Sequence, residues 1–355
     1  MAILSWLNDR RLFGPYGKAF ALLAALIALH FAAATYISVR DVGEMLSARQ
    51  GANVLKLALL PPILFAIWAF VQCVLRRVER PSRAILHLLY GKRFWLIRSV
   101  LLFTLLYPAN QAFLTLKVAI PRLIDFYADD ALILLDRALF LGNDPWVVSH
   151  ALFGPFTSLI DSAYYVWFFI VSMATLWATF SSDRRFQIHA SLSLFLVWAL
   201  LGNLLAVALS SVGPIFYDEF YQTDRFSGLI AALDGPYTTM QVRGFLLSKY
   251  GIEEIGSGIS AAPSIHVAVT ALIFLMVRRQ FGRSPLTVIA GGYLAVIFIG
   301  SVHLAWHYAI DGIISLILVP IIWKAVSAFL TRLERRRIES DMPARPFGSG
   351  VPQLN

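Results

Sequence analysis

Long apolar stretches alternate along the chain with short segments that hold most of its charged residues. A helix that crosses a membrane needs about 20 mostly apolar residues. Eight stretches approach this length and predict about eight membrane-spanning helices: 19–39, 57–75, 99–120, 159–180, 188–212, 263–277, 285–300 and 306–326. We therefore expect an all-α integral membrane protein in which the sixth and seventh helices are short.

The composition agrees with this pattern. Of the 355 residues, 58% are hydrophobic and 14% are charged, whereas a soluble domain carries about 25% charged residues. The net charge is +9, but Lys and Arg lie in short runs between apolar stretches, as orientation signals do. We therefore expect a membrane bilayer around the protein and no nucleic acid partner. The single cysteine, Cys73, lies in an apolar run, which excludes an intramolecular disulfide and a cysteine-based metal cluster.

The basic residues fall in alternate connections between the predicted helices. If the N-terminus is cytoplasmic, the connections on that side carry Arg10, Arg11, Lys18, Arg76, Arg77, Arg80, Arg83, Lys92, Arg93, Arg184, Arg185, Arg278, Arg279, Arg283, Arg332, Arg335, Arg336 and Arg337. The opposite connections hold acidic residues in 125–144 and 218–254. Because cytoplasmic loops are enriched in Lys and Arg, we expect both termini in the cytoplasm. The expected location is a bacterial inner membrane.

Two short polar clusters stand at the edges of apolar stretches. The first runs from Ala262 to His266, and the second runs from His303 to Asp311. In the predicted orientation both clusters lie at the extracytoplasmic face and at one membrane depth. We interpret them as two halves of one phosphate-handling site.

The first cluster has the features of an anion-binding helix start. Pro263 suits the first turn of a helix, where its missing N–H costs nothing. The following N–H groups have no partner within the helix, so a phosphate placed there meets free donors and the positive end of the helix dipole. Ser264 can add a hydrogen bond, and His266 can deliver a proton to a leaving oxygen. The alternative is an ordinary helix start in which His266 bonds to a neighbour.

The second cluster pairs a histidine with a carboxylate. If 306 onward is helical, His307 and Asp311 are four residues apart and share one face. Asp311 can then accept the Nδ1 proton and raise the basicity of Nε2. A nucleophile oriented by another group is the general pattern for covalent catalysis. The alternative is a His–Asp pair that only fastens the last helix to the bundle.

His303 extends the same spacing and raises the question of a metal site. On one straight helix the ends of the series His303, His307 and Asp311 would lie about 12 Å apart, which is too far for coordination by all three. A turn at 300–305 would relax that limit. We expect no metal and no cofactor, and we interpret His303 as a phosphate contact or a helix-end group.

These motifs resemble those of a known family. Residues 263–266, Pro-Ser-Ile-His, and residues 307–311, His-Tyr-Ala-Ile-Asp, are similar to two elements of the type 2 phosphatidic acid phosphatase (PAP2) superfamily. Residues 211–218, Ser-Val-Gly-Pro-Ile-Phe-Tyr-Asp, resemble a further element of its inositol phosphorylceramide synthase-like (Aur1-like) branch. The resemblance covers about 125–323 and leaves the first two predicted helices outside.

The resemblance implies a six-helix catalytic core and a phosphohistidine mechanism. The core would span 95–328, after a segment 1–94 with two additional helices and before a basic tail, 329–355. By matching position, His307 would attack phosphorus, Asp311 would orient it, His266 would protonate the departing alkoxide, and Ser264 would bind phosphate. Water or a lipid alcohol would then accept the group from His307. The implied substrate is a lipid phosphate or a phospholipid head group.

The chain departs from the phosphatase pattern at its phosphate-binding cations. Phosphatases of the superfamily carry Ser-Arg where this chain has Gly300-Ser301, and their Lys-x6-Arg-Pro element is absent. Charge on a transferred phosphoryl group is normally balanced by cations. The candidate replacements are three loop residues, Arg225, Arg243 and Lys249, and Lys117 near the outer end of the third predicted helix. Tyr217 is a further candidate for contact with the substrate. The missing arginine favours a head-group transferase over a simple phosphatase.

Two features complete the expectations. Residues 126–140 alternate apolar and acidic positions with helical spacing and predict an amphipathic helix on the outer membrane surface, which could guide lipid toward the site. The competing function is a lipid or solute transporter, in which the same polar residues line a path and no covalent intermediate forms. A non-catalytic scaffold with the same fold is the third possibility.

Overall fold

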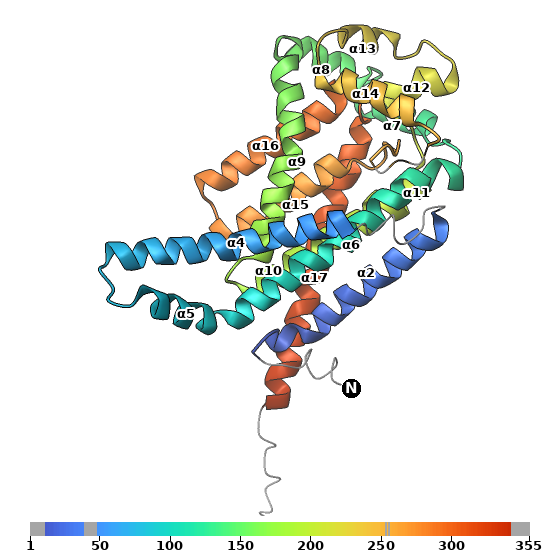
Figure 1. The fold of residues 1–355 in the computed structure, drawn as a ribbon. Coiled ribbons are helices and arrows are strands. Elements are labelled where there is room, and N and C mark those ends of the chain that lie inside the picture. The colour runs from blue at the N-terminus through green and yellow to red at the C-terminus, as the bar shows by residue number, and fades with distance from the viewer. Residues whose placement is uncertain (1–10, 39–47, 253, 255, 342–355) are drawn as a thin grey trace, which may run out of the picture.

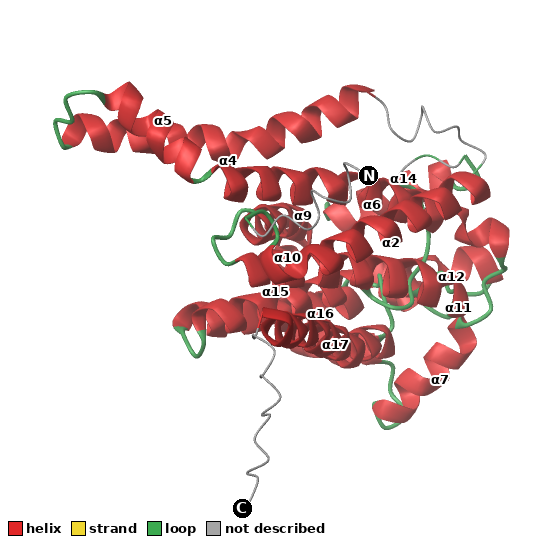
Figure 2. Ribbon diagram, turned by 90° about the horizontal axis from the view of Figure 1, so that it is seen from below, coloured by secondary structure: helices red, strands yellow, loops and turns green. Residues whose placement is uncertain are grey.

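The computed structural model describes residues 11–38, 48–252, 254 and 256–341. Within these ranges every regular element is a helix, as the apolar pattern predicts. Figure 1 shows a bundle of long helices with a group of short helices gathered at one end, and Figure 2 shows the same bundle from below.

The long helices coincide with the eight predicted stretches. They are α2 (Gly17–Ile37), α4 (Ala48–Leu75), α6 (Arg93–Leu123), α9 (Thr157–Thr179), α10 (Arg184–Leu196), α15 (Ile265–Phe281), α16 (Pro285–His303) and α17 (Ala309–Asp341). The helix α10 continues through the π-helical segment η3 (Val197–Leu205) into α11 (Ala206–Ala208). A 3-10 turn, η1 (Gly14–Tyr16), precedes α2.

Six helical segments of the described chain are long and apolar enough to cross a membrane: 14–37, 93–123, 145–179, 184–208, 285–303 and 309–340. The chain is therefore a multi-pass membrane protein. The other two predicted spans are helical too, but their apolar segments are shorter. The apolar part of α4 is Leu59–Leu75, and α15 has 17 residues.

The short helices come mainly from the two connections predicted to be extracytoplasmic. They are α7 (Asp129–Leu139), α8 (Pro145–Phe153) with the 3-10 turn η2 (Gly154–Phe156), α12 (Pro214–Tyr221), α13 (Ser227–Ala232) and α14 (Thr238–Lys249). In Figure 1 they gather at the upper end of the bundle. One further short helix, α5 (Pro81–Gly91), follows α4 at the side of the bundle. The predicted helix within 126–140 is thus confirmed as α7, and its place on the outer membrane surface stays a prediction.

The buried apolar side chains form two main clusters. The larger one joins α9, α10, α15, α16 and α17 with the short helices above them. The second packs α2 against α6, α10 and α17 through residues such as Leu23, Ile27, Leu102, Ile188 and Leu330, all at most 2% exposed. The first predicted helix is therefore integrated into the bundle beside the family-like core.

The start of α15 differs from the prediction by two residues. Ser264 is the N-cap, and its Oγ accepts a hydrogen bond from the N–H of Val267 at 3.4 Å. A side-chain oxygen at this position satisfies one of the donors that a helix start leaves unpaired. Pro263 consequently lies just before the cap and not in the first turn.

Candidate active site

The structure brings the two polar clusters together at the upper end of the bundle. The N–H of Ser264 donates to the carbonyl oxygen of Asp311 at 3.3 Å. The hydroxyl of Ser315 donates to the carbonyl oxygens of both residues, at 2.9 and 3.0 Å. These bonds tie the start of α15 to the first turn of α17. The rings of His266 and His307 consequently lie with their centroids 6.4 Å apart.

His307 lies just before α17, with Asp311 behind it. The Nδ1 atom of His307 is 3.6 Å from Oδ2 of Asp311, which is within ion-pair reach but longer than a hydrogen bond. Asp311 is fully buried, and its Oδ2 accepts the N–H of Tyr308 at 3.1 Å. Within the described chain, His307 Nδ1 and Asp311 Oδ1 are buried without a hydrogen-bond partner. Catalytic hydrogen bonds are often long without substrate and tighten in the complex, and closing this gap would give Nδ1 of His307 its acceptor.

The ring of His266 is held between aromatic side chains of α9. Tyr164 stacks on it with centroids 4.5 Å apart, and the Trp167 ring lies 4.2 Å away. The indole Nε1 of Trp167 also donates to Thr270 Oγ1 at 3.0 Å and to the carbonyl oxygen of His266 at 3.2 Å. These contacts hold the imidazole of His266 against α9, with its centroid 6.4 Å from that of His307.

Both histidines line a cavity of about 320 Å³. Its walls are mostly apolar and come from η3, α9, α12, α14 and the segment before α15: Tyr164, Phe168, Gly202, Ala206, Val212, Phe216, Val242, Phe245, Leu246, Gly256, Gly258, Ile259, Ala261, Pro263, Ile265 and Trp306. The polar lining besides the two histidines is Lys117, Tyr165 and Ser260. Among the described residues, Lys117 is the only Lys or Arg in this lining.

Two of the predicted phosphate contacts, Ser264 of the first cluster and His303 of the second, lie outside the cavity lining. The hydroxyl of Ser264 caps α15 and is fully buried outside the cavity lining. His303, the last residue of α16, is fully buried too. Its Nδ1 and Nε2 lie 2.8 and 2.9 Å from the hydroxyls of Ser149 and Thr157, and its ring stacks on His150 at 3.9 Å. The structure therefore does not bring His303 to the cavity.

The predicted loop cations are each neutralised by a nearby acid, and none lines the cavity. Arg225 donates two hydrogen bonds to Asp144, at 3.0 and 2.6 Å, and these bonds raise its pKa. The Nζ atom of Lys249 is 2.7 Å from Glu254. Arg243 forms an ion pair with Glu219 and also donates to the carbonyl oxygen of Ile215. The predicted substrate contact Tyr217 donates its hydroxyl to Asp130 at 2.6 Å.

One residue of the 211–218 element, Gly213, packs closely against residues 305–310, which carry His307 and are called the catalytic segment below. Gly213 has φ +81°, a conformation that favours glycine. A Cβ at this position would lie 2.8 Å from the carbonyl oxygen of Trp306 and 2.9 Å from Cβ of Ala261. Two residues later, the N–H of Ile215 donates to the carbonyl oxygen of Ala305 at 2.8 Å. The absence of a side chain at Gly213 thus permits the close packing beside His307.

We expect Gly213→Ala to destabilise the protein and to lower activity, because the new Cβ meets backbone and a positive φ together. The cost is about 1–3 kcal/mol, which a thermal-melting comparison in detergent measures. Gly292→Ala is the matched control, since its Cβ meets nothing within 4 Å. Equal melting temperatures for wild type and Gly213→Ala would contradict the close packing.

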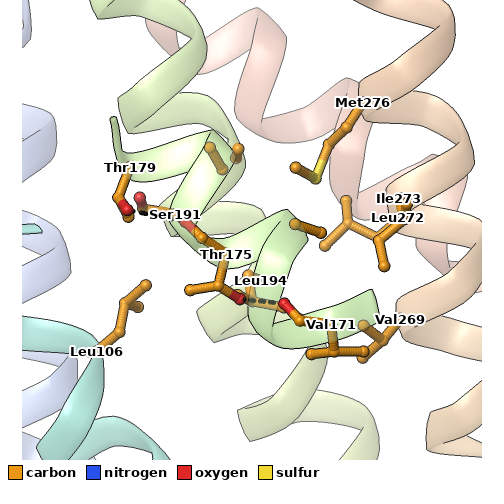
Figure 3. Close-up of a pocket in the computed structure, with 13 residues that line it drawn as sticks. Leu106, Val171, Thr175, Thr179, Ser191, Leu194, Val269, Leu272, Ile273 and Met276 are labelled. Carbon is orange, nitrogen blue, oxygen red and sulfur yellow. Dashed lines mark hydrogen bonds between the residues drawn. The ribbon is translucent and has the colours of Figure 1, made fainter. Parts of the chain in front are cut away.

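A second, much smaller cavity lies deeper in the bundle between α9, α10 and α15 (Figure 3). Its volume is about 10 Å³, and its lining is apolar except for the hydroxyls of Thr175, Thr179 and Ser191. The two threonine hydroxyls donate back to carbonyl oxygens of their own helix at 2.8 Å. No ionisable side chain lines this space, so it has the character of a packing gap.

Two carboxylates of α7 contact the residues that follow His307, which the sequence pattern did not reveal. Asp129 is fully buried and Asp136 is 3% exposed. Burial raises the pKa of both, and that of Asp136 to about 6. The exposed side chains of this helix include Leu134 and Leu139 as well as Asp130. The helix therefore turns Asp129 and Asp136 inward, toward the segment that carries His307.

Comparison with known proteins agrees with these motifs. A family model described as the PAP2 superfamily matches residues 130–325, which is more than half of the chain and includes both polar clusters. No curated protein and no solved structure matches the chain.

Proposed function

The chain belongs to the PAP2 superfamily, and from this premise we propose that it transfers the phosphoryl or head group of a membrane lipid through His307. Membership suggests a lipid phosphatase or phosphotransferase that acts on a lipid phosphate in the membrane. The observation that carries the proposal is the meeting of His307, backed by Asp311, with His266 across one cavity.

The roles follow from which atoms face one another. Nδ1 of His307 faces Asp311, so Nε2 is the nitrogen left to attack phosphorus. As the N–P bond forms, the bond from phosphorus to the lipid oxygen breaks, and a protonated His266 delivers its proton to that oxygen. In the second half, His266 takes a proton from the acceptor, whose oxygen displaces His307 from phosphorus. Asp311 stabilises the imidazolium character that develops on His307.

The cavity provides two kinds of phosphate contact. The first turn of α15 presents the N–H groups of Ile265 and His266, which have no acceptor within the helix. The second contact is Lys117, which supplies positive charge to the same space. Within the described chain no carboxylate forms an ion pair with Lys117. Phosphatases of the superfamily have an arginine at the position of Ser301. We propose that Lys117 supplies the positive charge that this arginine provides in them.

Lys117→Met should lower kcat/KM by about 10²-fold, because one positive donor is lost where charge develops on the phosphoryl oxygens. Steady-state kinetics in mixed micelles measures the effect. Lys18→Met, at an exposed position of α2, is the control. Unchanged kinetics for Lys117→Met would remove this residue from the phosphate site.

The transferase assignment is supported by the environment of Ser301. This side chain is fully buried, and its hydroxyl donates to the carbonyl oxygen of Phe298 at 2.7 Å. Its own carbonyl oxygen accepts the N–H of His307 at 2.9 Å. The position that carries arginine in phosphatases is thus packed as a small residue. We propose on this ground a lipid alcohol as acceptor, as in the inositol phosphorylceramide synthase-like branch, and an extracytoplasmic site.

The deciding experiment incubates purified protein with phosphatidic acid and with phospholipids, each with and without a lipid alcohol. A transferase yields a new phospholipid that depends on the alcohol, and a phosphatase yields inorganic phosphate without it. A transporter would move lipid across liposome membranes and form neither product. That last outcome would refute the enzymatic function altogether.

A further inference from the structure

We propose that the surface helix α7 positions the catalytic segment, with Asp136 as the residue that holds the first turn of α17 in place. This inference rests on the proposed function, since it assigns a role in the same reaction. Asp136 is a positioning residue in this proposal, because it acts through the backbone next to His307 and does not line the substrate cavity.

The contact of Asp136 with α17 is direct and involves both carboxylate oxygens. Oδ2 accepts the N–H of Ala309 and Oδ1 accepts the N–H of Ile310, each at 2.8 Å. These are first-turn donors of α17, which a helix normally leaves unpaired. The residue before the helix, Tyr308, has no short side-chain acceptor to cap them. A carboxylate 173 residues earlier in the chain does so instead.

A second carboxylate of the same helix holds the other side of the segment. Oδ1 of Asp129 accepts the hydroxyl of Tyr308 at 2.8 Å and the N–H of Gly213 at 3.0 Å. Its Oδ2 accepts the N–H of Val212 at 3.0 Å and the hydroxyl of Tyr221 at 3.1 Å. Asp129 and Asp136 are two helical turns apart. Together they hold the three residues that follow His307, 308–310, and the glycine that packs against Trp306.

The carboxylates of Asp129 and Asp136 are stabilised by hydrogen bonds from uncharged groups. Burying an ionised carboxylate is costly unless its oxygens are hydrogen-bonded, and here backbone N–H and tyrosine O–H groups fill that need. The whole set of bonds converges on residues 308–310 and 212–213. The position of the His307 backbone therefore depends on α7, and the gap of 3.6 Å between His307 and Asp311 depends on it as well.

The test replaces Asp136 by asparagine. One amide oxygen can still accept from one N–H, but the amide NH₂ then faces the other N–H, donor against donor. We expect kcat, and the single-turnover rate of His307 phosphorylation, to fall about 10²-fold, as for a displacement of about 1 Å of a reacting group. KM should stay within about twofold, because Asp136 does not touch the substrate.

Asp130→Asn is the matched control, since Asp130 is an exposed acid of the same helix that contacts Tyr217 and not the catalytic segment. Asp136→Glu keeps both acceptor oxygens and should retain more activity than Asp136→Asn. If Asp136→Asn does not fold, the pair Asp136→Glu and Asp136→Gln decides, because these two side chains have the same length and differ only in one acceptor oxygen: equal kcat in both would overturn the inference, and a lower kcat in Asp136→Gln with unchanged KM would support it.

The result separates this inference from the proposed function. Wild-type kcat in a folded Asp136→Asn variant, together with an inactive His307→Ala variant, would overturn the positioning role and leave the enzyme assignment standing. A loss confined to KM would also overturn the role. Full turnover by His307→Ala would instead refute the proposed function itself.

Discussion

His307→Ala is expected to reduce turnover of the lipid substrate by at least about 10⁴-fold, because removing a covalent nucleophile removes the whole two-step path. Product formation is followed in mixed micelles with the lipid identified in the deciding experiment. The variant should fold, since the imidazole Nδ1 has no hydrogen-bond partner within the described chain.

His87→Ala is the control for this substitution, because His87 is exposed on α5 and lies away from the cavity. It should retain wild-type rates. If His307→Ala and His87→Ala are equally active, no phosphohistidine forms at this position, and the polar cluster has another role.

Asp311→Asn is expected to lower kcat by about 10³- to 10⁴-fold, comparable to the loss of the orienting acid in a catalytic triad. Asparagine can still accept the N–H of Tyr308 through its amide oxygen, so the backbone bond at 3.1 Å persists. What disappears is the negative charge that orients His307 and stabilises its imidazolium form.

The measurement for Asp311→Asn combines kcat with thermal melting. Asp125→Asn, at an exposed position, is the control and should change neither quantity. If Asp311→Asn melts at a lower temperature but keeps its kcat, the His–Asp pair serves only to fasten α17 to the bundle. That was the alternative interpretation of the spacing between His307 and Asp311.

The helices could be predicted because their physical cause is local. Apolar runs of about 20 residues mark the positions of α2, α6, α9, α10, α16 and α17. The starts of helices were less predictable. Ser264 caps α15, so Pro263 lies before the helix and not in its first turn as predicted. The helix α17 begins at Ala309, after His307, and its first donors bind a carboxylate from a distant helix.

The site was predictable only in part. Motif spacing located His266, His307 and Asp311; the two histidines line one cavity, and Asp311 lies behind His307. The sequence could not show which loop cations are neutralised by acids, because the carboxylate that pairs with Arg225 lies 81 residues away in the chain. The role of Asp136 was hidden for a similar reason, since acids on an amphipathic helix usually indicate a solvated face. In α7, Asp136 is buried while leucines such as Leu134 and Leu139 are exposed.

Rapid quenching of turnover tests the role of His307 most directly. The purified protein is mixed with a lipid labelled at its phosphate, quenched, and digested, and the fragment 284–324 is sequenced by mass spectrometry. We predict an acid-labile, alkali-stable phosphoryl label on His307 in the wild type, and none in His307→Ala. Turnover without covalent label, or a label on another residue such as His303, would contradict the phosphohistidine mechanism.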